Sequence, residues 1–253
     1  MIDVHPLPAF LVAIVTLSIA AWLGTTRFTT LRSTAEQQRD DFAVIQGATL
    51  TLLGLIIGFT FSMALDRYEQ RKLYEEEEAN AIGTEYVRAE LLPAADAARV
   101  QQLLRDYLEQ RMLFYTTRDE QRLAGIGAAT ARLQSDLWAA VKSPALAQPT
   151  PLMALAVAGM NDVLNSQGYT QAAWWNRIPF SAWMMMGVIA VCATMLVGVG
   201  ARKGTGFSRL MLVLPVIISM AFFLIADIDS PRRGIIRVVP QNLLALAGSL
   251  SPR

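Results

Sequence analysis

The chain has 253 residues, of which 53% are hydrophobic and only 17% are charged. A soluble domain carries roughly 25% charged residues, so this composition argues against a wholly soluble protein. The net charge of +1 gives no basic footprint for nucleic acid. One cysteine, Cys192, and one histidine, His5, exclude an internal disulfide, a Cys- or His-based metal site and a catalytic triad. We therefore expect no cofactor, and an enzyme is disfavoured.

The charged residues are spread unevenly along the chain. Residues 66–177 hold 15 acidic and 12 basic side chains, and long uncharged runs lie on both sides of them. A bilayer core of about 30 Å needs about 20 mostly apolar residues in a helix. Four segments meet or approach this length: 4–26, 42–65, 178–201 and 210–226. The pattern predicts an all-α polytopic membrane protein with four transmembrane helices and a helical soluble insert between spans 2 and 3.

This reading divides the chain into four parts. They are transmembrane helices 1 and 2 (1–65), the soluble insert (66–177), transmembrane helices 3 and 4 (178–227) and a short C-terminal tail (228–253). Lys and Arg side chains near the span ends number six on the side of the two short connections and eight on the other. By the positive-inside rule this small excess favours a cytoplasmic insert and cytoplasmic termini.

Within the insert, the hydrophobic spacing predicts helices and no strands. The second span continues without a break to about residue 92, and further helices are expected over 95–117, 119–141 and 152–166, with a turn-rich break at 143–151. The acidic run Glu75–Glu78 is interpreted as a solvated helix face and not as a metal site, because four consecutive positions point in different directions around a helix. An acidic ring in an oligomer is the alternative. Trp174 and Trp175, just before the third span, are typical of an interfacial anchor.

The second span differs from a plain lipid anchor because small and polar residues interrupt it. Gly54 and Gly58 form a GxxxG pair, which predicts close helix packing. Thr51, Leu55 and Phe59 follow one another at four-residue spacing and so share one stripe. If several copies surround an axis, this stripe forms a polar ring and two apolar rings, an arrangement that can gate by dewetting. The alternative is that the stripe belongs to an ordinary core.

The fourth span ends in a charged motif at the membrane boundary. Asp227 and Asp229 lie where hydrocarbon gives way to headgroups, and Arg232 and Arg233 follow closely. Ionisable residues at this depth are costly and are usually paired or functional. Two interpretations remain open: local capping with ion pairing, or a part in an ion pathway. For Asn80, Tyr86 and Arg88 in the insert, a polar contact between helices competes with a functional role.

Two stretches of the sequence resemble a known family. LLGLIIGFTFSMALDRYEQRKLYEEEEANAIGTEYVRAELLP in the second helix and FLIADIDSPRRGIIRV after the fourth are similar to bacterial bestrophin-like membrane proteins, a family of unknown function. A more distant resemblance is to true bestrophins, which are pentameric anion channels in animals and cation-permeable channels in bacteria. The resemblance implies that the second helix lines a pore.

The resemblance also implies which residues form the narrowest part of that pore. Gly58-Phe59 and Arg67-Tyr68 fit the bestrophin pattern, which places the hydrophobic neck on Thr51, Leu55 and Phe59. Thr51 is polar where a bestrophin neck is apolar. The tail also lacks the acidic run that forms the calcium clasp of animal bestrophins.

The resulting hypothesis is a homo-oligomeric ion channel or pore in the bacterial inner membrane, a pentamer by analogy. Its expected partners are the lipid bilayer, further copies of the chain and inorganic ions, with no nucleic acid. The alternative is a non-conducting membrane scaffold or sensor whose helical insert binds a partner. An enzyme built on Asp227, Asp229 and Arg232 is a distant third, because no nucleophile or metal set accompanies them.

Overall fold

The computed structural model describes residues 5–27, 37–201 and 209–250. These residues form helices and no strand, which confirms the all-α prediction. Among them, four helical stretches are long and apolar enough to cross a bilayer: Pro6–Thr26, Arg39–Leu91, Pro151–Val199 and Arg209–Asp229. The chain is therefore a membrane protein. Most of the two short connections whose charges enter the orientation count lies outside the described residues.

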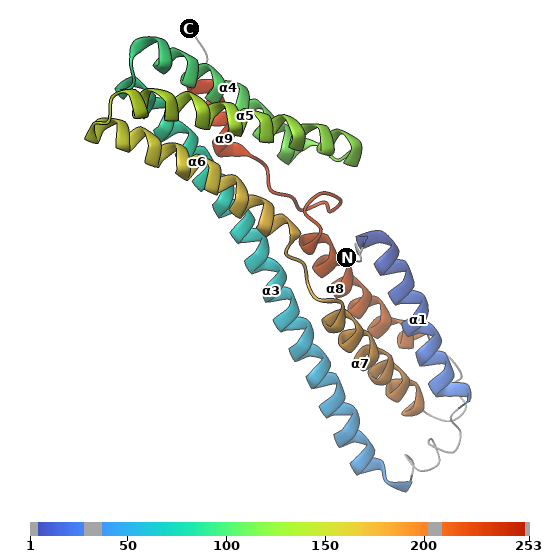
Figure 1. Cartoon of the computed structure of the whole chain (residues 1–253). Coiled ribbons are helices and arrows are strands. Elements are labelled where there is room, and N and C mark those ends of the chain that lie inside the picture. Colours follow the sequence, from blue (N-terminus) through green and yellow to red (C-terminus); the bar gives the residue numbers. More distant parts are fainter. Residues whose placement is uncertain (1–4, 28–36, 202–208, 251–253) are drawn as a thin grey trace. The chain divides into compact units, whose positions relative to one another are not determined.

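The chain folds as two compact units. The first comprises residues 1–66 and 177–236, and the second comprises residues 67–176 and 237–253. Both units contain part of α3 (Arg39–Arg88), a single helix of 50 residues that Figure 1 shows without interruption. The helix contains no proline, and beyond the apolar span it is rich in strong helix formers such as Glu, Lys, Arg and Ala. The predicted continuation of the second span into the insert is thus present.

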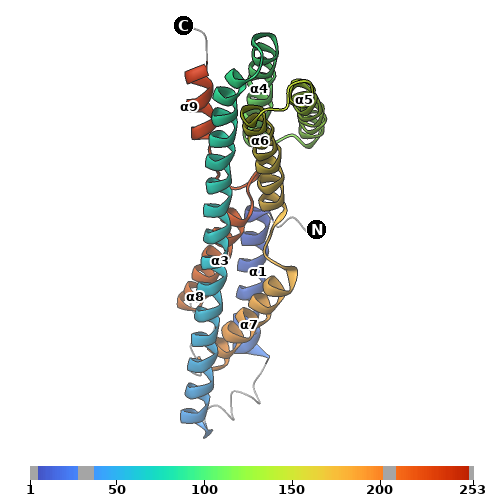
Figure 2. The ribbon, with the colours of Figure 1, turned by 60° about the vertical axis from the view of Figure 1, so that its left-hand side comes forward.

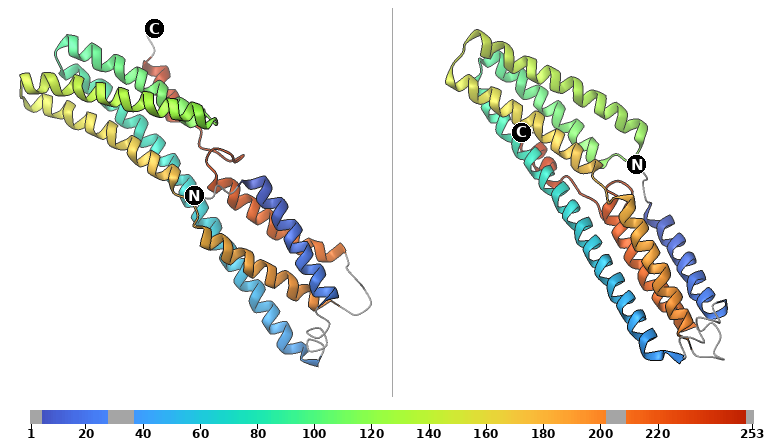
Figure 3. Two further views of the ribbon diagram at one scale, coloured as in Figure 1. Left: turned by 45° about the vertical axis from the view of Figure 1, so that its right-hand side comes forward. Right: turned by 60° about the horizontal axis from the view of Figure 1, so that its bottom comes forward.

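In the first unit, α1 (Pro6–Thr26), α7 (Phe180–Val199) and α8 (Val213–Asp229) run alongside one another, as both views of Figure 3 show. Small residues let α1 and α7 approach closely. A methyl group added to Gly24 would overlap the backbone of α7, and one added to Gly198 would overlap the backbone of α1. Such close approach lets van der Waals contacts hold helices together where lipid offers no hydrophobic driving force.

Aromatic pairs and a tolerated proline complete the packing of α8. The ring of Phe223 meets that of Phe10 edge-on at 6.0 Å, and Phe222 meets Trp183 at 6.2 Å. Pro215 is buried and lies in the first turn of α8, where backbone N–H groups have no partner within the helix. The span is preceded by a 3-10 turn, η2 (Arg209–Leu212).

The second unit is a helical bundle. Beside its part of α3 lie α4 (Ala94–Thr116) and α6 (Pro151–Trp175), and α5 (Glu120–Ala147) packs against these two helices, as Figures 1 and 2 show. A 3-10 turn, η1 (Ala89–Leu91), joins α3 to α4, so the predicted end of the long helix near residue 92 holds. The bundle core is apolar and fully buried at, for example, Ile82, Val100, Leu104, Leu137, Met160 and Val163.

The second and third of these helices are longer than predicted. α5 continues through the buried Pro144 to Ala147, in place of the expected break at 143–151. This proline has no N–H group and so removes one helical hydrogen bond, and the helix ends three residues later. The chain then turns quickly, because the Thr150 hydroxyl accepts a hydrogen bond from the Met153 amide at 3.2 Å and caps α6.

α6 also extends beyond the predicted end at residue 166, and it carries Trp174 into the bundle. Trp174 is 4% exposed and packs against the rings of Phe114 and Tyr115 at 5.0 and 5.5 Å. The interpretation of Trp174 as an interfacial anchor is therefore wrong, because its ring fills the core of the insert. Trp175 is exposed.

The close contact of α1 with α7 generates a first prediction. Gly198→Ala should force the two helices apart and lower the free energy of unfolding by about 1–3 kcal/mol, the usual cost of overpacking. The measurement is equilibrium unfolding of the detergent-solubilised protein. Gly187→Ala, in the same helix α7, is the matched control, because no described atom lies within 4 Å of a methyl group built at Gly187. Equal destabilisation by both changes would contradict this packing.

Candidate functional site

The membrane-spanning part of α3 is largely uncovered by the rest of its own chain. Only 6% of its apolar window is buried, whereas the corresponding windows of the other spans are 22–44% buried. The buried positions Leu53, Thr60 and Ala64 lie seven and four residues apart and so share one side of the helix. The opposite side contacts none of the described residues closely enough to be buried.

The predicted neck residues lie on this uncovered side. Leu55 is 53% exposed, Phe59 is 63% exposed, and Thr51 is exposed as well. The stripe is therefore not part of a core formed by the residues that the structure describes. Gly54 and Gly58 are also exposed, and no described atom lies within 4 Å of a methyl group built on either. The packing and pore roles of these five residues stay predictions about an assembly.

The same side of α3 remains exposed beyond the apolar span, where it becomes acidic. Asp66 follows Leu55 by eleven residues and Glu77 follows Phe59 by eighteen, close to three and five whole helical turns. Both carboxylates are exposed. The nearby basic residue Arg71 points to the other side and is buried.

The acidic run Glu75–Glu78 divides into two exposed and two buried side chains. Glu76 and Glu77 are solvated, as expected, whereas Glu75 and Glu78 are 1% and 0% exposed. The interpretation of the whole run as a solvated face is therefore wrong for its two ends. Positions 75 and 78 are three residues apart, so they share the side of α3 that faces the bundle.

Glu78 is the centre of a buried polar network. It forms an ion pair with Arg111 of α4 and accepts hydrogen bonds from the Tyr115 hydroxyl at 3.1 Å and the Thr170 hydroxyl at 3.3 Å. Burial is the largest single effect and lowers the pKa of Arg111, but the Glu78 carboxylate together with Tyr107 and Tyr115 outweighs it, so the pKa of Arg111 is raised. Burial and then Glu78 also raise the pKa of Tyr115. Breaking such a pair strands a buried charge and costs about 3–5 kcal/mol.

Glu75 holds a helix that the sequence did not reveal. Its carboxylate accepts hydrogen bonds from the backbone amides of Asn242 and Leu243 at 3.0 and 2.9 Å and from the Asn242 side chain at 2.7 Å. These amides begin α9 (Gln241–Leu250), which was expected only as part of a short tail. A carboxylate at a helix start satisfies free N–H groups and complements the helix dipole.

This cap generates a second prediction. Glu75→Ala should loosen α9, because a lost N-cap costs about 1–2 kcal/mol. Amide hydrogen exchange of residues 241–250 should then be about 5- to 30-fold faster. Glu76→Ala, one position along and exposed, is the control and should leave the exchange unchanged. Unchanged protection of α9 in Glu75→Ala would contradict the cap.

The charged motif after α8 organises the backbone around it. Asp227 accepts hydrogen bonds from the amides of Ile235 and Ile236 at 2.7 and 2.8 Å, and so closes the turn that follows the span. Asp229 accepts from the Ile178 amide at 3.2 Å, and Arg177 donates to the Asp229 carbonyl at 2.6 Å. These contacts tie the start of α7 to the end of α8.

The arginines of the motif lie at its edge. Arg232 is half-buried, and the exposed Arg233 contacts the ring nitrogen Nε2 of His5. The two carboxylates thus bind backbone amides, which favours the capping interpretation over the ion-pathway interpretation. A part for Asp227 and Asp229 in ion passage stays a prediction.

The weaker candidates of the insert make contacts between helices. The Tyr86 hydroxyl accepts a hydrogen bond from Arg105 of α4 at 2.6 Å, and Arg88 lies 4.0 Å from Asp162 of α6. A polar interhelical contact therefore accounts for both side chains. Asn80 is exposed.

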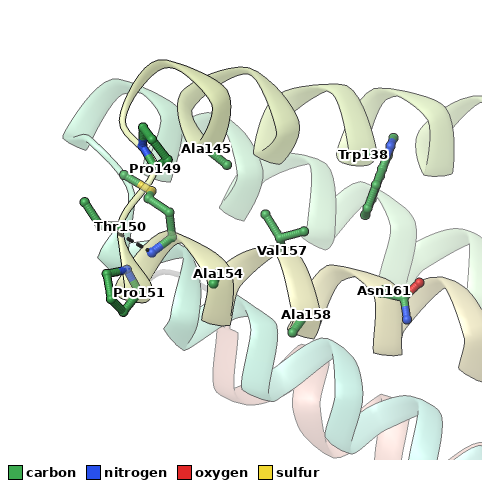
Figure 4. Close-up of a pocket in the computed structure, with 10 residues that line it drawn as sticks. Trp138, Ala145, Pro149, Thr150, Pro151, Ala154, Val157, Ala158 and Asn161 are labelled. Carbon is green, nitrogen blue, oxygen red and sulfur yellow. Dashed lines mark hydrogen bonds between the residues drawn. The ribbon is translucent and has the colours of Figure 1, made fainter.

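An open groove of about 720 Å³ lies between α5 and α6. Figure 4 shows its residues, among them Trp138 from α5 and Ala154, Val157 and Asn161 from α6. Its walls are mostly apolar and carry no titratable side chain. Across the described part of the chain, no three His, Cys, Asp or Glu side chains gather as a metal site would need.

The whole chain can be compared with known proteins. Its fold is similar to crystal structures of a bacterial bestrophin homologue from Klebsiella pneumoniae. One, a point variant, has a TM-score of 0.65 at 13% identity, and another, phased on zinc, has a TM-score of 0.60 at 16% identity. Each comparison covers 96% of this chain and 98% of the other.

No curated protein matches the sequence. The family comparison is decisive, because the Bestrophin-like domain matches residues 11–243, nearly the whole chain. The expected family resemblance is confirmed: the chain belongs to the Bestrophin-like family.

Proposed function

We propose that several copies of this chain assemble around an axis with the exposed side of α3 facing inward, and that the central opening conducts ions. The observation that carries the proposal is the exposure of the second span, of which only 6% is buried within the chain. A helix that is exposed in its own subunit meets either lipid or other subunits. The exposed Gly54 and Gly58 favour subunits, since small residues let helices approach closely.

In such an assembly, Leu55 and Phe59 form the narrowest apolar rings. A ring of apolar side chains excludes water until it widens, so it can gate ions without a charged barrier. Thr51 adds a polar ring one turn before Leu55, where a hydroxyl can contact a permeating ion that has lost part of its water. The neck is thus apolar over two layers only.

Beyond the neck, the same side of α3 presents carboxylates. Asp66 and Glu77, repeated in each copy, raise the local concentration of cations at the inner mouth. The proposal for the location follows the family: the inner membrane of a bacterium, with the insert in the cytoplasm and five copies around the axis.

The neck generates a third prediction. Phe59→Ala should increase the single-channel current of the purified protein in planar bilayers, because a smaller ring weakens the dewetting barrier. Phe61→Ala is the matched control, since this second phenylalanine lies two residues later on the opposite side of α3. Equal effects of the two changes, or no current from an intact oligomer at any voltage or ion, would contradict the proposal.

The alternative function is a non-conducting scaffold or sensor whose insert binds a partner. The groove between α5 and α6 supports it, together with the exposed leucines Leu146, Leu152 and Leu155, which are next in sequence to residues that line the groove. The mass of the detergent-solubilised protein separates the two functions. A monomer or dimer cannot enclose an axial opening with α3, so it would leave only the alternative.

A further inference from the structure

Glu85 is a buried carboxylic acid that the proposed pore does not use. It lies near the end of α3, in the second unit, and is 0% exposed. Neither of its carboxylate oxygens has a hydrogen-bond partner among the described residues. A buried ionised carboxylate without partners is very costly, so this arrangement suits the protonated acid.

The helix opposite is shaped to accept this side chain. Gly159 of α6 lies against Glu85, and a methyl group built on Gly159 would overlap the Glu85 carboxylate and lie 2.6 Å from the Arg88 guanidinium. A glycine within a helix costs roughly 1 kcal/mol relative to alanine. In this position it provides the space that the Glu85 carboxyl group occupies.

Few charged groups face Glu85. Arg88 lies one turn later on α3, and Asp162 is the single charged residue of α6. These two lie 4.0 Å apart at the more exposed edge of the contact. On α4, Arg105 donates hydrogen bonds to the Tyr86 hydroxyl and to the Gln102 side chain and not to Glu85. On η1 the only charged residue, Glu90, is exposed, and α9 carries no charged residue.

We propose that Glu85 and Gly159 form a proton-operated latch between α3 and α6. The two helices close over Glu85 while its carboxyl group holds a proton, and their contact loosens when the group is ionised. The latch is a property of the insert and does not depend on whether the chain conducts ions.

The direction of the pH dependence follows from the surroundings. Burial raises the pKa of Glu85 from its ordinary value of 4.5 to about 8 in the closed state, with Arg88 opposing and Asp162 adding to the increase. The open state, in water, keeps the ordinary pKa. The closed state is therefore most stable at acid pH, and it weakens as the pH rises from about 4.5 to about 8. Above that the balance stays constant, because both states are ionised.

The test measures opening of α6 by the labelling of single cysteines in the full-length protein. With Cys192→Ser as background, Ala156→Cys places a thiol at a buried position of α6, and Leu155→Cys places one at an exposed neighbouring position. The labelling rate at position 156 is divided by the rate at position 155, and this ratio cancels the pH dependence that the two thiols share. With Glu85 present, this ratio should rise by up to about tenfold per pH unit from pH 5.5 and level off near pH 8.

Two variants decide the interpretation. Glu85→Gln keeps the shape of the side chain without its charge, so the ratio should not change with pH in this variant. The proposal would be overturned if the ratio rose equally in Glu85→Gln, or if it stayed constant with Glu85 present. Asp162→Asn alters an exposed side chain and removes a negative charge that raises the pKa of Glu85. In Asp162→Asn the ratio should then level off at a lower pH. If it levels off at a higher pH, or at the same pH as without the change, the latch is contradicted, and this test holds even if Glu85→Gln fails to fold.

Discussion

The structure depends on one long helix that is covered along one side only. The buried positions of α3 begin at Leu53, Thr60 and Ala64 in the apolar span and continue with Arg71, Glu75, Glu78, Ile82 and Glu85 in the insert. This spacing keeps one side of the helix against its own chain over more than 30 residues, close to the 3.6-residue period. The other side, with Leu55, Phe59, Asp66 and Glu77, is free for other molecules. A single helix thereby contributes to the interior of the chain and, in the proposed assembly, supplies a surface for other copies.

The buried side of α3 is unusual because it carries acids, and each acid is accommodated by a different means. Glu75 receives the amides at the start of α9, Glu78 receives a guanidinium and two hydroxyls, and Glu85 receives only space. The first two arrangements stabilise the ionised carboxylate, since donors replace the lost water. The third stabilises the neutral acid.

Much of the fold could be predicted from local patterns. Spans appear as uncharged runs of sufficient length, and the exit of α3 from the membrane appears as a helix-forming sequence without a proline. The roles of Glu75 and Glu78 could not be predicted, because periodicity shows that they share a side and does not show which side is covered. α9 depends on Glu75, which lies 167 residues away in the sequence. Similarly, Gly24 and Gly198 carry the contact between α1 and α7, whereas the recognisable GxxxG pair, Gly54 and Gly58, has no neighbour among the described residues.

The polarity of the second span is by itself a weak argument for a pore. The hydroxyls of Thr49 and Thr60 donate hydrogen bonds to the carbonyls of Ile45 and Ile56, each four residues earlier, at 2.8 Å. A threonine bonded in this way leaves no free donor, so it is tolerated against lipid. The exposed side of α3 favours a pore for steric and electrostatic reasons. Gly54 and Gly58 leave a shallow face on α3 that another helix can approach closely. The same side of α3 carries Asp66 at the end of the apolar span. A carboxylate there is stable only where water reaches it, which supports the proposal that this side of α3 faces a water-filled opening.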